Sequence, residues 1–299
     1  APYIHKINKL KIEKNAIILV HNYQTPEIYH GIADVAADSL ALAIEASKTE
    51  ADLIIMCGVH FMAETAKLMN PQKKVLLPDM SAGCSLSSSI TGKDVRLLKE
   101  KYPGVPVVSY VNTSADVKAE TDICCTSANA VKIVNSLGVK KVIFLPDNYL
   151  ANYVSSQTDV EIISWKGTCI VHEQFNEKEI NEIRQSNPGI KIIAHPECPP
   201  DVIKASDFAG STTSMIKYVE DNQPKKVMMV TECSMSDNVQ IENPNVKFIK
   251  PCNLCPHMKK ITLPKVLDCL ENETNEIIIN NETIEKARLS VERMAKVGR

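Results

Sequence analysis

The sequence lacks any apolar run of about 18 residues, the length that a membrane-spanning helix needs. Its first 15 residues also lack the apolar core of a signal peptide. The net charge is only −2 over 299 residues, so no basic surface for nucleic acid or for an acidic membrane is expected. These absences favour a cytoplasmic protein without a nucleic-acid or membrane partner. In that reducing compartment the ten cysteines are expected to be thiols or metal ligands rather than disulfides.

The sequence contains one CxxC pair, Cys252 and Cys255, and lacks a second one. A closed structural zinc site takes four protein ligands, so this pair alone does not complete a zinc knuckle. It is therefore interpreted either as a redox pair or as part of a site assembled from distant cysteines.

Short apolar segments do occur, and they alternate with segments of helical period such as 39–48 and 128–137. The apolar segments are 16–20, 51–56, 74–78, 105–111, 140–146, 160–165, 191–195, 225–230 and 246–251. Buried strands that alternate with helices are typical of parallel sheets covered on both faces. The predicted fold class is therefore α/β.

One pattern repeats three times along the chain. Cys84 and Cys169 are 85 residues apart, and Cys169 and Cys255 are 86 apart. Two further pairs give 85 and 84 residues: Tyr110 with His195, and Ser127 with Ser211. The repeat predicts three homologous α/β domains in a pseudo-threefold arrangement around a central cavity. Their expected bounds are 1–84 with 256–299, then 85–169, then 170–255.

Each repeat has the same internal order. A buried strand is followed by polar residues, then by an acidic residue, and then by Ser or Thr at an expected helix start. The acidic residues Asp34, Asp122 and Asp207 are interpreted as structural groups that bind loop amides. Ligands bind at the carboxyl ends of parallel strands, so the polar residues and the cysteines are expected to converge on the central cavity.

Three thiolates, one from each repeat, would leave one coordination position open. Zinc with three cysteines and a water molecule fits this pattern, and so does an iron–sulfur cluster with one iron free of protein ligands. The spacing alone leaves both possibilities open.

The segments "HNYQTPE", "ADSL", "YVNTSADVKAETDICCTSANAV", "AHPEC", "GST" and "CPHMKKITL" resemble the quinolinate synthase family. The resemblance keeps order and spacing over nearly the whole chain, with departures at Ala37 and Thr213, where Gly is usual. It implies a transferase of NAD biosynthesis that condenses iminoaspartate with dihydroxyacetone phosphate to give quinolinate, phosphate and water. It also implies a 4Fe–4S cluster held by Cys84, Cys169 and Cys255, with one open iron as Lewis acid.

The resemblance further implies a set of substrate contacts. These are His21, Ser39, Tyr110, Val111, Asn112, Ser127, His195, Pro196, Glu197, Ser211 and Thr212. Glu197 is the expected general base, because a carboxylate directly after a buried strand needs a partner or a chemical role. Tyr23, Tyr110 and His21 are expected as acid–base or positioning groups. The plainer interpretations are that the serines cap helices and that the histidines end strands.

A non-enzymatic iron–sulfur sensor of oxygen or redox state is the alternative function. An enzyme is favoured because the three repeats together supply more polar residues than are needed to hold a cluster. The expected partners are the two substrates and, transiently, the enzyme that makes iminoaspartate. Cys252 is expected either to form a disulfide with Cys255 once Cys255 has left the cluster, or to be inert.

Overall fold

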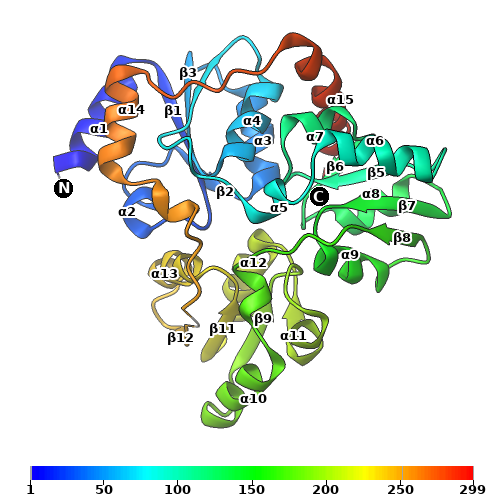
Figure 1. Cartoon of the computed structure of the whole chain (residues 1–299). Coiled ribbons are helices and arrows are strands. Elements are labelled where there is room, and N and C mark those ends of the chain that lie inside the picture. The colour runs from blue at the N-terminus through cyan, green and yellow to red at the C-terminus, as the bar shows by residue number, and fades with distance from the viewer. Residues whose placement is uncertain (1, 251, 299) are drawn as a thin grey trace.

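The computed structural model describes residues 2–250 and 252–298, which form three α/β units (Figure 1). Residues of all three units line one central cavity. Each unit contains a four-stranded sheet in which every strand pair is parallel. The spatial order is the same in all three sheets, with the first strand of the unit between the second and the third. The predicted α/β class and its threefold repetition are confirmed.

The first sheet has the order β2-β1-β3-β4. Its strands are β1 (Ala16–His21), β2 (Val35–Ala37), β3 (Leu53–Cys57) and β4 (Lys74–Leu76). The N-terminal helices are α1 (Pro2–Glu13), α2 (Pro26–Tyr29), α3 (Ser39–Lys48), α4 (His60–Met69) and α5 (Ser85–Ser88).

The second and third sheets have the orders β6-β5-β7-β8 and β10-β9-β11-β12. The second unit holds β5 (Val107–Tyr110), β6 (Ile123–Cys125), β7 (Lys141–Leu145), β8 (Glu161–Ser164), α6 (Gly92–Lys101), α7 (Ala115–Ala119), α8 (Ala130–Ser136) and α9 (Asn148–Ser155). The third holds η1 (His172–Gln174), α10 (Glu177–Ser186), β9 (Lys191–Ala194), α11 (Pro200–Ala205), β10 (Phe208–Ala209), α12 (Thr212–Asn222), β11 (Lys226–Val230), α13 (Cys233–Glu242) and β12 (Lys247–Phe248).

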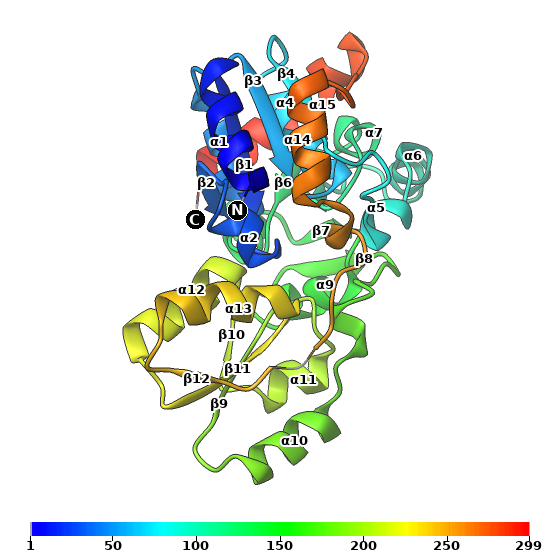
Figure 2. The same cartoon turned by 90° about the vertical axis from the view of Figure 1, so that its left-hand side faces the viewer.

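The last part of the chain returns from the third unit to the other two (Figures 1 and 2). It passes through η2 (Met258–Lys260) to α14 (Leu263–Asn272), which packs on α1. The final helix, α15 (Asn281–Val297), packs on α7 and β6 of the second unit and on α4 of the first. The domain bounds expected from the repeat stay a prediction. None of the described helices is long and apolar enough to span a membrane.

The three repeat-equivalent aspartates perform one structural task. In each unit the carboxylate accepts a hydrogen bond from a backbone N–H of the sheet's first strand, at 2.8 Å. The pairs are Asp34 with Ile18, Asp122 with Val107 and Asp207 with Ile192. The aspartates therefore fix the short second strand beside the first. The predicted structural role is confirmed, but the amides belong to the first strand and not, as expected from the sequence, to loops.

Candidate active site

The cavity between the three units lies at the carboxyl ends of their strands. It brings together most of the site residues predicted from the sequence. Those that line it are His21, Tyr23, Ser39, Cys84, Tyr110, Asn112, Ser127, Cys169, His195, Glu197, Thr212 and Cys255.

Three predicted contact residues lie outside this lining. Val111 lines a smaller pocket next to it, beneath Ser39. Ser211 caps helix α12, where its side chain accepts a hydrogen bond from the Ser214 backbone N–H. Pro196 is buried between His195 and Glu197. Their contact with substrate stays a prediction.

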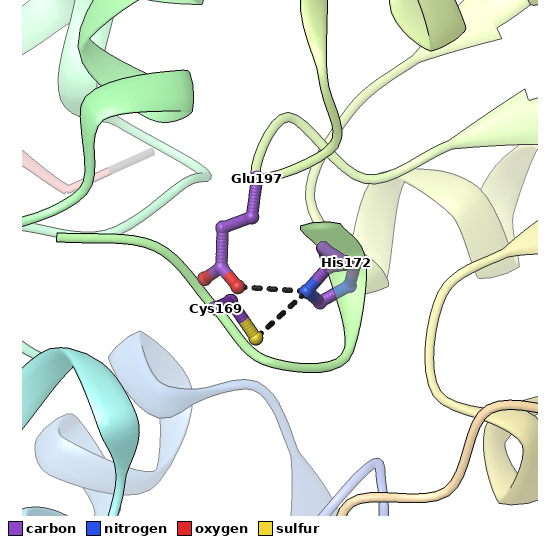
Figure 3. Close-up of side chains that lie close together, drawn as sticks. All are labelled: Cys169, His172 and Glu197. Atoms are coloured by element: carbon purple, nitrogen blue, oxygen red, sulfur yellow. Dashed lines mark hydrogen bonds and ion pairs between the residues drawn. The ribbon is translucent and has the colours of Figure 1, made fainter. Parts of the chain in front are cut away.

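Glu197 is the central charged group of the cavity. Its side chain is buried and receives a hydrogen bond from the Tyr110 hydroxyl at 2.5 Å. On its other side, His172 Nδ1 lies 2.9 Å from Glu197 Oε2 and 3.1 Å from Cys169 Sγ (Figure 3). Burial alone would raise the pKa of Glu197. The hydrogen bonds that the carboxylate accepts from His172 and Tyr110 outweigh burial and lower the pKa. Glu197 is therefore a carboxylate at neutral pH.

A chain of hydrogen bonds continues from His172 to Tyr23. Thr231 Oγ1 lies 2.9 Å from His172 Nε2 and 2.7 Å from the Tyr23 hydroxyl. Burial, reinforced by the charge of Glu197, holds the pKa of both Tyr23 and Tyr110 well above the ordinary value. Both phenols therefore keep their protons, and the carboxylate of Glu197 is connected to each of them.

His21 and His195 share a different arrangement. In each ring, Nδ1 accepts the backbone N–H of the residue two positions later, from Tyr23 at 3.2 Å and from Glu197 at 3.3 Å. Burial lowers the pKa of His21 to about 4 and that of His195 to about 3, so both rings are neutral at pH 7. A neutral ring that accepts at Nδ1 carries its proton on Nε2. In His195 this Nε2–H reaches Ser127 Oγ at 3.1 Å.

The lining is rich in neutral donors and contains no lysine or arginine among the described residues. Ser39 and Thr212 are the first residues of helices α3 and α12, where backbone N–H groups and the helix dipole favour anions. The cap of α3 is Asp38 rather than Ser39, so the plainer interpretation of Ser39 as a helix cap is wrong. Asn112 Oδ1 is buried without a hydrogen-bond partner in the described structure. A ligand N–H or O–H group would satisfy it.

The three cysteines have equivalent surroundings. Burial raises the pKa of each thiol, to about 12 for Cys84, and in each case two backbone N–H groups oppose the rise. These N–H groups belong to the residues two and three positions later: Leu86 and Ser87, Val171 and His172, and His257 and Met258. Backbone N–H groups aimed at sulfur also favour a metal-bound thiolate. Soft sulfur donors, one from each unit, fit an iron–sulfur cluster that leaves one iron open.

A second donor set overlaps the first. Cys169, His172 and Glu197 place sulfur, nitrogen and oxygen atoms within 4.8 Å of one another, close enough to hold a metal ion (Figure 3). A metal ion there would occupy Glu197 as a ligand and remove it as a base.

The loop that carries Cys255 is fixed by a buried ion pair. Glu232 is fully buried, and its carboxylate accepts the Cys255 backbone N–H at 3.1 Å and lies 3.0 Å from Lys259 Nζ. Lys259 Nζ also donates to the Tyr23 carbonyl and to Ser234 Oγ, each at 2.7 Å. The pair thereby connects the Cys255 loop to the strand ends of the first and third units.

Sequence reasoning missed His172, Thr231, Glu232 and Lys259. Thr231 and Glu232 follow the buried strand β11 directly, which is the signal that identified Glu197. His172 stands three residues after Cys169, where the other repeats have Ser87 and Met258. That difference between repeats could have identified it.

Comparison with known proteins gives consistent results. The family model "Quinolinate synthetase A protein" matches residues 5–296. A quinolinate synthase of Sinorhizobium fredii is 61% identical over 99% of this chain and 83% of its own. Quinolinate synthase 2 of Mesorhizobium japonicum is 60% identical over 98% and 91%, and a quinolinate synthase of Xylella fastidiosa is 57% identical over 98% and 87%.

A solved structure of an ABC-transporter solute-binding protein from Rhodopseudomonas palustris matches with a TM-score of 0.22 and 8% identity. That match covers 94% of this chain and 79% of the other, and it is too weak to inform fold or function. The chain belongs to the quinolinate synthase family.

Proposed function

We propose that this protein is a quinolinate synthase of NAD biosynthesis that condenses iminoaspartate with dihydroxyacetone phosphate to quinolinate, phosphate and water. Family membership supports the proposal, and one observation carries it: polar side chains from three equivalent units line one cavity together with three equivalent cysteines. The cytoplasmic location and the transient contact with the enzyme that makes iminoaspartate stay predictions.

Cys84, Cys169 and Cys255 are the proposed holders of a 4Fe–4S cluster. When bound, such a cluster supplies a Lewis-acidic iron with one position free of protein ligands. Support comes from the soft donor set, from its origin in all three units and from the paired backbone N–H groups at each sulfur.

Binding of two anionic substrates is assigned to neutral donors. The Nε2–H groups of His21 and His195 and the hydroxyls of Ser39, Ser127 and Thr212 face the cavity without competing positive charge. Neutral donors bind a carboxylate or phosphate group of a substrate, and they add no positive charge that would pair with the Glu197 carboxylate. The Asn112 Oδ1 acceptor is available for the nitrogen-bound hydrogen of iminoaspartate.

Proton transfer is assigned to Glu197 and the two tyrosines. Imine–enamine tautomerisation, ketose isomerisation and two dehydrations each remove a proton from one atom and return a proton to another. Glu197 takes protons as a carboxylate, while Tyr110 donates to it directly and Tyr23 is connected through Thr231 and His172. Glu197, Tyr110, His172 and Thr231 are buried, so these proton-transfer groups are shielded from bulk water.

The test is anaerobic purification of the wild-type chain and of four single variants. The wild type should be brown, contain iron and acid-labile sulfide, and form quinolinate from the two substrates. Cys84→Ser, Cys169→Ser and Cys255→Ser should each lose colour, iron and activity, whereas Cys252→Ser should keep them.

Three outcomes would contradict parts of the proposal. A brown protein that is inert towards both substrates would favour the redox or oxygen sensor. A colourless, active protein that contains zinc would show that the cysteines hold zinc and not a 4Fe–4S cluster. Loss of colour in Cys252→Ser but not in Cys255→Ser would overturn the choice of ligands.

A further inference from the structure

Two cysteines outside the cavity lie side by side. The Sγ atoms of Cys233 and Cys252 are 3.3 Å apart, and neither residue lines the cavity. Cys233 is the first residue of α13, and Cys252 lies in the segment between β12 and η2. The Cys233 backbone N–H also donates to the Asn253 carbonyl at 3.0 Å, so main-chain contact holds the two segments together.

A disulfide requires the two sulfurs to approach to about 2.05 Å, about 1.25 Å closer than they are here. Cys252 is exposed, so its side chain is free to rotate by that amount, whereas Cys233 is 5% exposed and fixed at a helix start. We propose that Cys233 and Cys252 are a redox modification site that forms a reversible disulfide.

The two thiols have different accessibility, and this sets the order of the chemistry. The Cys252 thiolate attacks a small-molecule disulfide, an S–S bond of the reagent breaks, and one reagent thiolate leaves. Cys233 then loses its proton to water and attacks Cys252 Sγ, which releases the second reagent thiolate. The two cysteine thiols are oxidised, and the reagent disulfide is reduced to two thiols. Burial and the adjacent Cys252 raise the pKa of Cys233 to about 12, in keeping with Cys252 reacting first.

The site has a consequence for Cys255. The CxxC spacing in the sequence suggests a Cys252–Cys255 disulfide, but the fold directs Cys252 towards Cys233. When Cys233 resolves the mixed disulfide at Cys252, no mixed disulfide remains there for Cys255 to attack. This protection of Cys255 rests on its proposed ligand role, whereas the disulfide itself does not.

The test treats the purified full chain with glutathione buffers of increasing oxidised fraction. The samples are alkylated under denaturing conditions, digested without reduction and mapped by mass spectrometry. The expected result is a 233–252 linked peptide, a fall of two from the ten free thiols, and full reversal by dithiothreitol. Cys269→Ser, which removes a buried cysteine far from this pair in sequence, is the matched control and should form the same link.

Cys233→Ser should leave Cys252 as a stable mixed disulfide with glutathione, and Cys252→Ser should leave Cys233 unmodified. A 252–255 link in the wild type would overturn the proposal. So would a wild-type chain in which Cys252 carries glutathione and no 233–252 link forms. Iron content, measured on the same samples, tests the protection of Cys255 separately: in oxidised Cys233→Ser the mixed disulfide at Cys252 stays open to attack by Cys255, so oxidised wild type should retain more iron. If no variant contains iron, the proposed cluster fails while the peptide map still decides the disulfide.

Discussion

At the scale of single residues, hydrogen bonds divide three of the four histidines that line the cavity, His21, His172 and His195, into two kinds. His21 and His195 accept a backbone N–H at Nδ1, which places the proton of the neutral ring on Nε2. His172 instead presents Nδ1 to the Glu197 carboxylate and Nε2 to the Thr231 hydroxyl. In the neutral ring its proton lies on Nδ1, between the ring and Glu197. The first kind is suited to binding an anion and the second to passing a proton.

Glu197→Gln tests the proposed base. Gln has nearly the same shape and still accepts the Tyr110 hydroxyl, but it carries no charge and takes no proton. We expect a folded protein that keeps its colour and binds quinolinate, with turnover lower by about 10²–10⁴-fold. Glu179→Gln, on the exposed first turn of α10, is the control and should be unaffected. Turnover near that of wild type would exclude Glu197 as the base and direct attention to Tyr23.

The pH dependence of stability follows from the buried histidines. Their pKa is 6.5 in the unfolded chain but about 4 for His21 and about 3 for His195 in the fold. Below pH 6.5 the unfolded chain binds these protons first, so stability is complete above pH 6.5 and falls as the pH drops towards the folded pKa. Between pH 7 and pH 5 each histidine should cost about 2 kcal/mol.

Urea unfolding of the metal-free protein at pH 7 and pH 5 measures this cost. From pH 7 to pH 5, the free energy of unfolding of His195→Gln should fall by about 2 kcal/mol less than that of wild type. His5→Gln, which removes an exposed histidine on α1, should lose as much as wild type. Equal losses in wild type and His195→Gln would show that His195 is not held neutral by the fold.

At the scale of elements, the loop between β12 and α14 combines two tasks. It carries Cys255 and it connects the third unit to the first. Lys259 makes three contacts across this junction, to Glu232, Ser234 and the Tyr23 carbonyl. Because Glu232 is fully buried, its charge depends on Lys259 as the neighbouring cation.

Lys259→Met tests this anchor. Removal of one partner leaves a buried carboxylate without its cation, which typically costs about 3–5 kcal/mol. We expect a loss of that size in urea unfolding, together with faster release of iron to a chelator. Lys260→Met is the matched control, because Lys260 Nζ makes one exposed bond to the Ser81 carbonyl. Equal losses in the two variants would show that the Glu232–Lys259 pair does not anchor the loop.

The sequence predicts the first, third and fourth strands of each sheet well and the short second strand poorly, for a physical reason. Each of the nine predicted apolar segments overlaps one strand, since buried parallel strands are apolar throughout. The missed strands β2, β6 and β10 have only two or three residues, too few for a recognisable period. Their positions depend on Asp34, Asp122 and Asp207, whose partners lie 15 or 16 residues away in sequence. The repeat identified those aspartates, but their bonds to first-strand amides required the structure.

The candidate site was predictable to the extent that it follows strand ends. His21, Tyr110 and His195 stand at equivalent positions of the three units, and the topology alone brings them to one cavity. The connection through Thr231 and His172 was not predictable in this way. It depends on the directions of the side chains of His172 in η1 and Thr231 after β11. The three repeats do not share these two residues, so the repeat pattern does not reveal them.

At the scale of the whole molecule, the three units are joined unequally. One continuous apolar cluster includes Val20 and Ile55 of the first unit, Val108 and Phe144 of the second, and Val291 of α15. The third unit has two apolar clusters of its own, one around Ile192 and one around Ile193, with Tyr23 as the first-unit side chain packed against the latter.

Polar bonds carry much of the contact between the third unit and the first. Asn22 Nδ2 donates to Thr212 Oγ1 at 2.9 Å, and Thr213 Oγ1 donates to Asp38 at 2.7 Å. Asn238 Nδ2 donates to two first-unit carbonyls, those of Asn22 at 3.2 Å and Gln24 at 2.8 Å. Such contacts contribute less free energy than a shared apolar core, because each replaces a bond to water.

We therefore expect the third unit to open before the other two. Native-state hydrogen exchange in low urea should show a smaller opening free energy for β9 and β11 than for β1, β3 and β5. Asn238→Ala leaves two buried carbonyls without this donor, and it should lower the opening free energy of the third unit by about 1–3 kcal/mol while β5 is unchanged. Asn222→Ala, at the exposed end of α12, removes a bond within that helix and should change neither. The same opening free energy in all three sheets would mean that the cavity is closed by one cooperative fold. A lower value in the third sheet alone would mean that the unit which carries His195 and Glu197 opens independently of the other two.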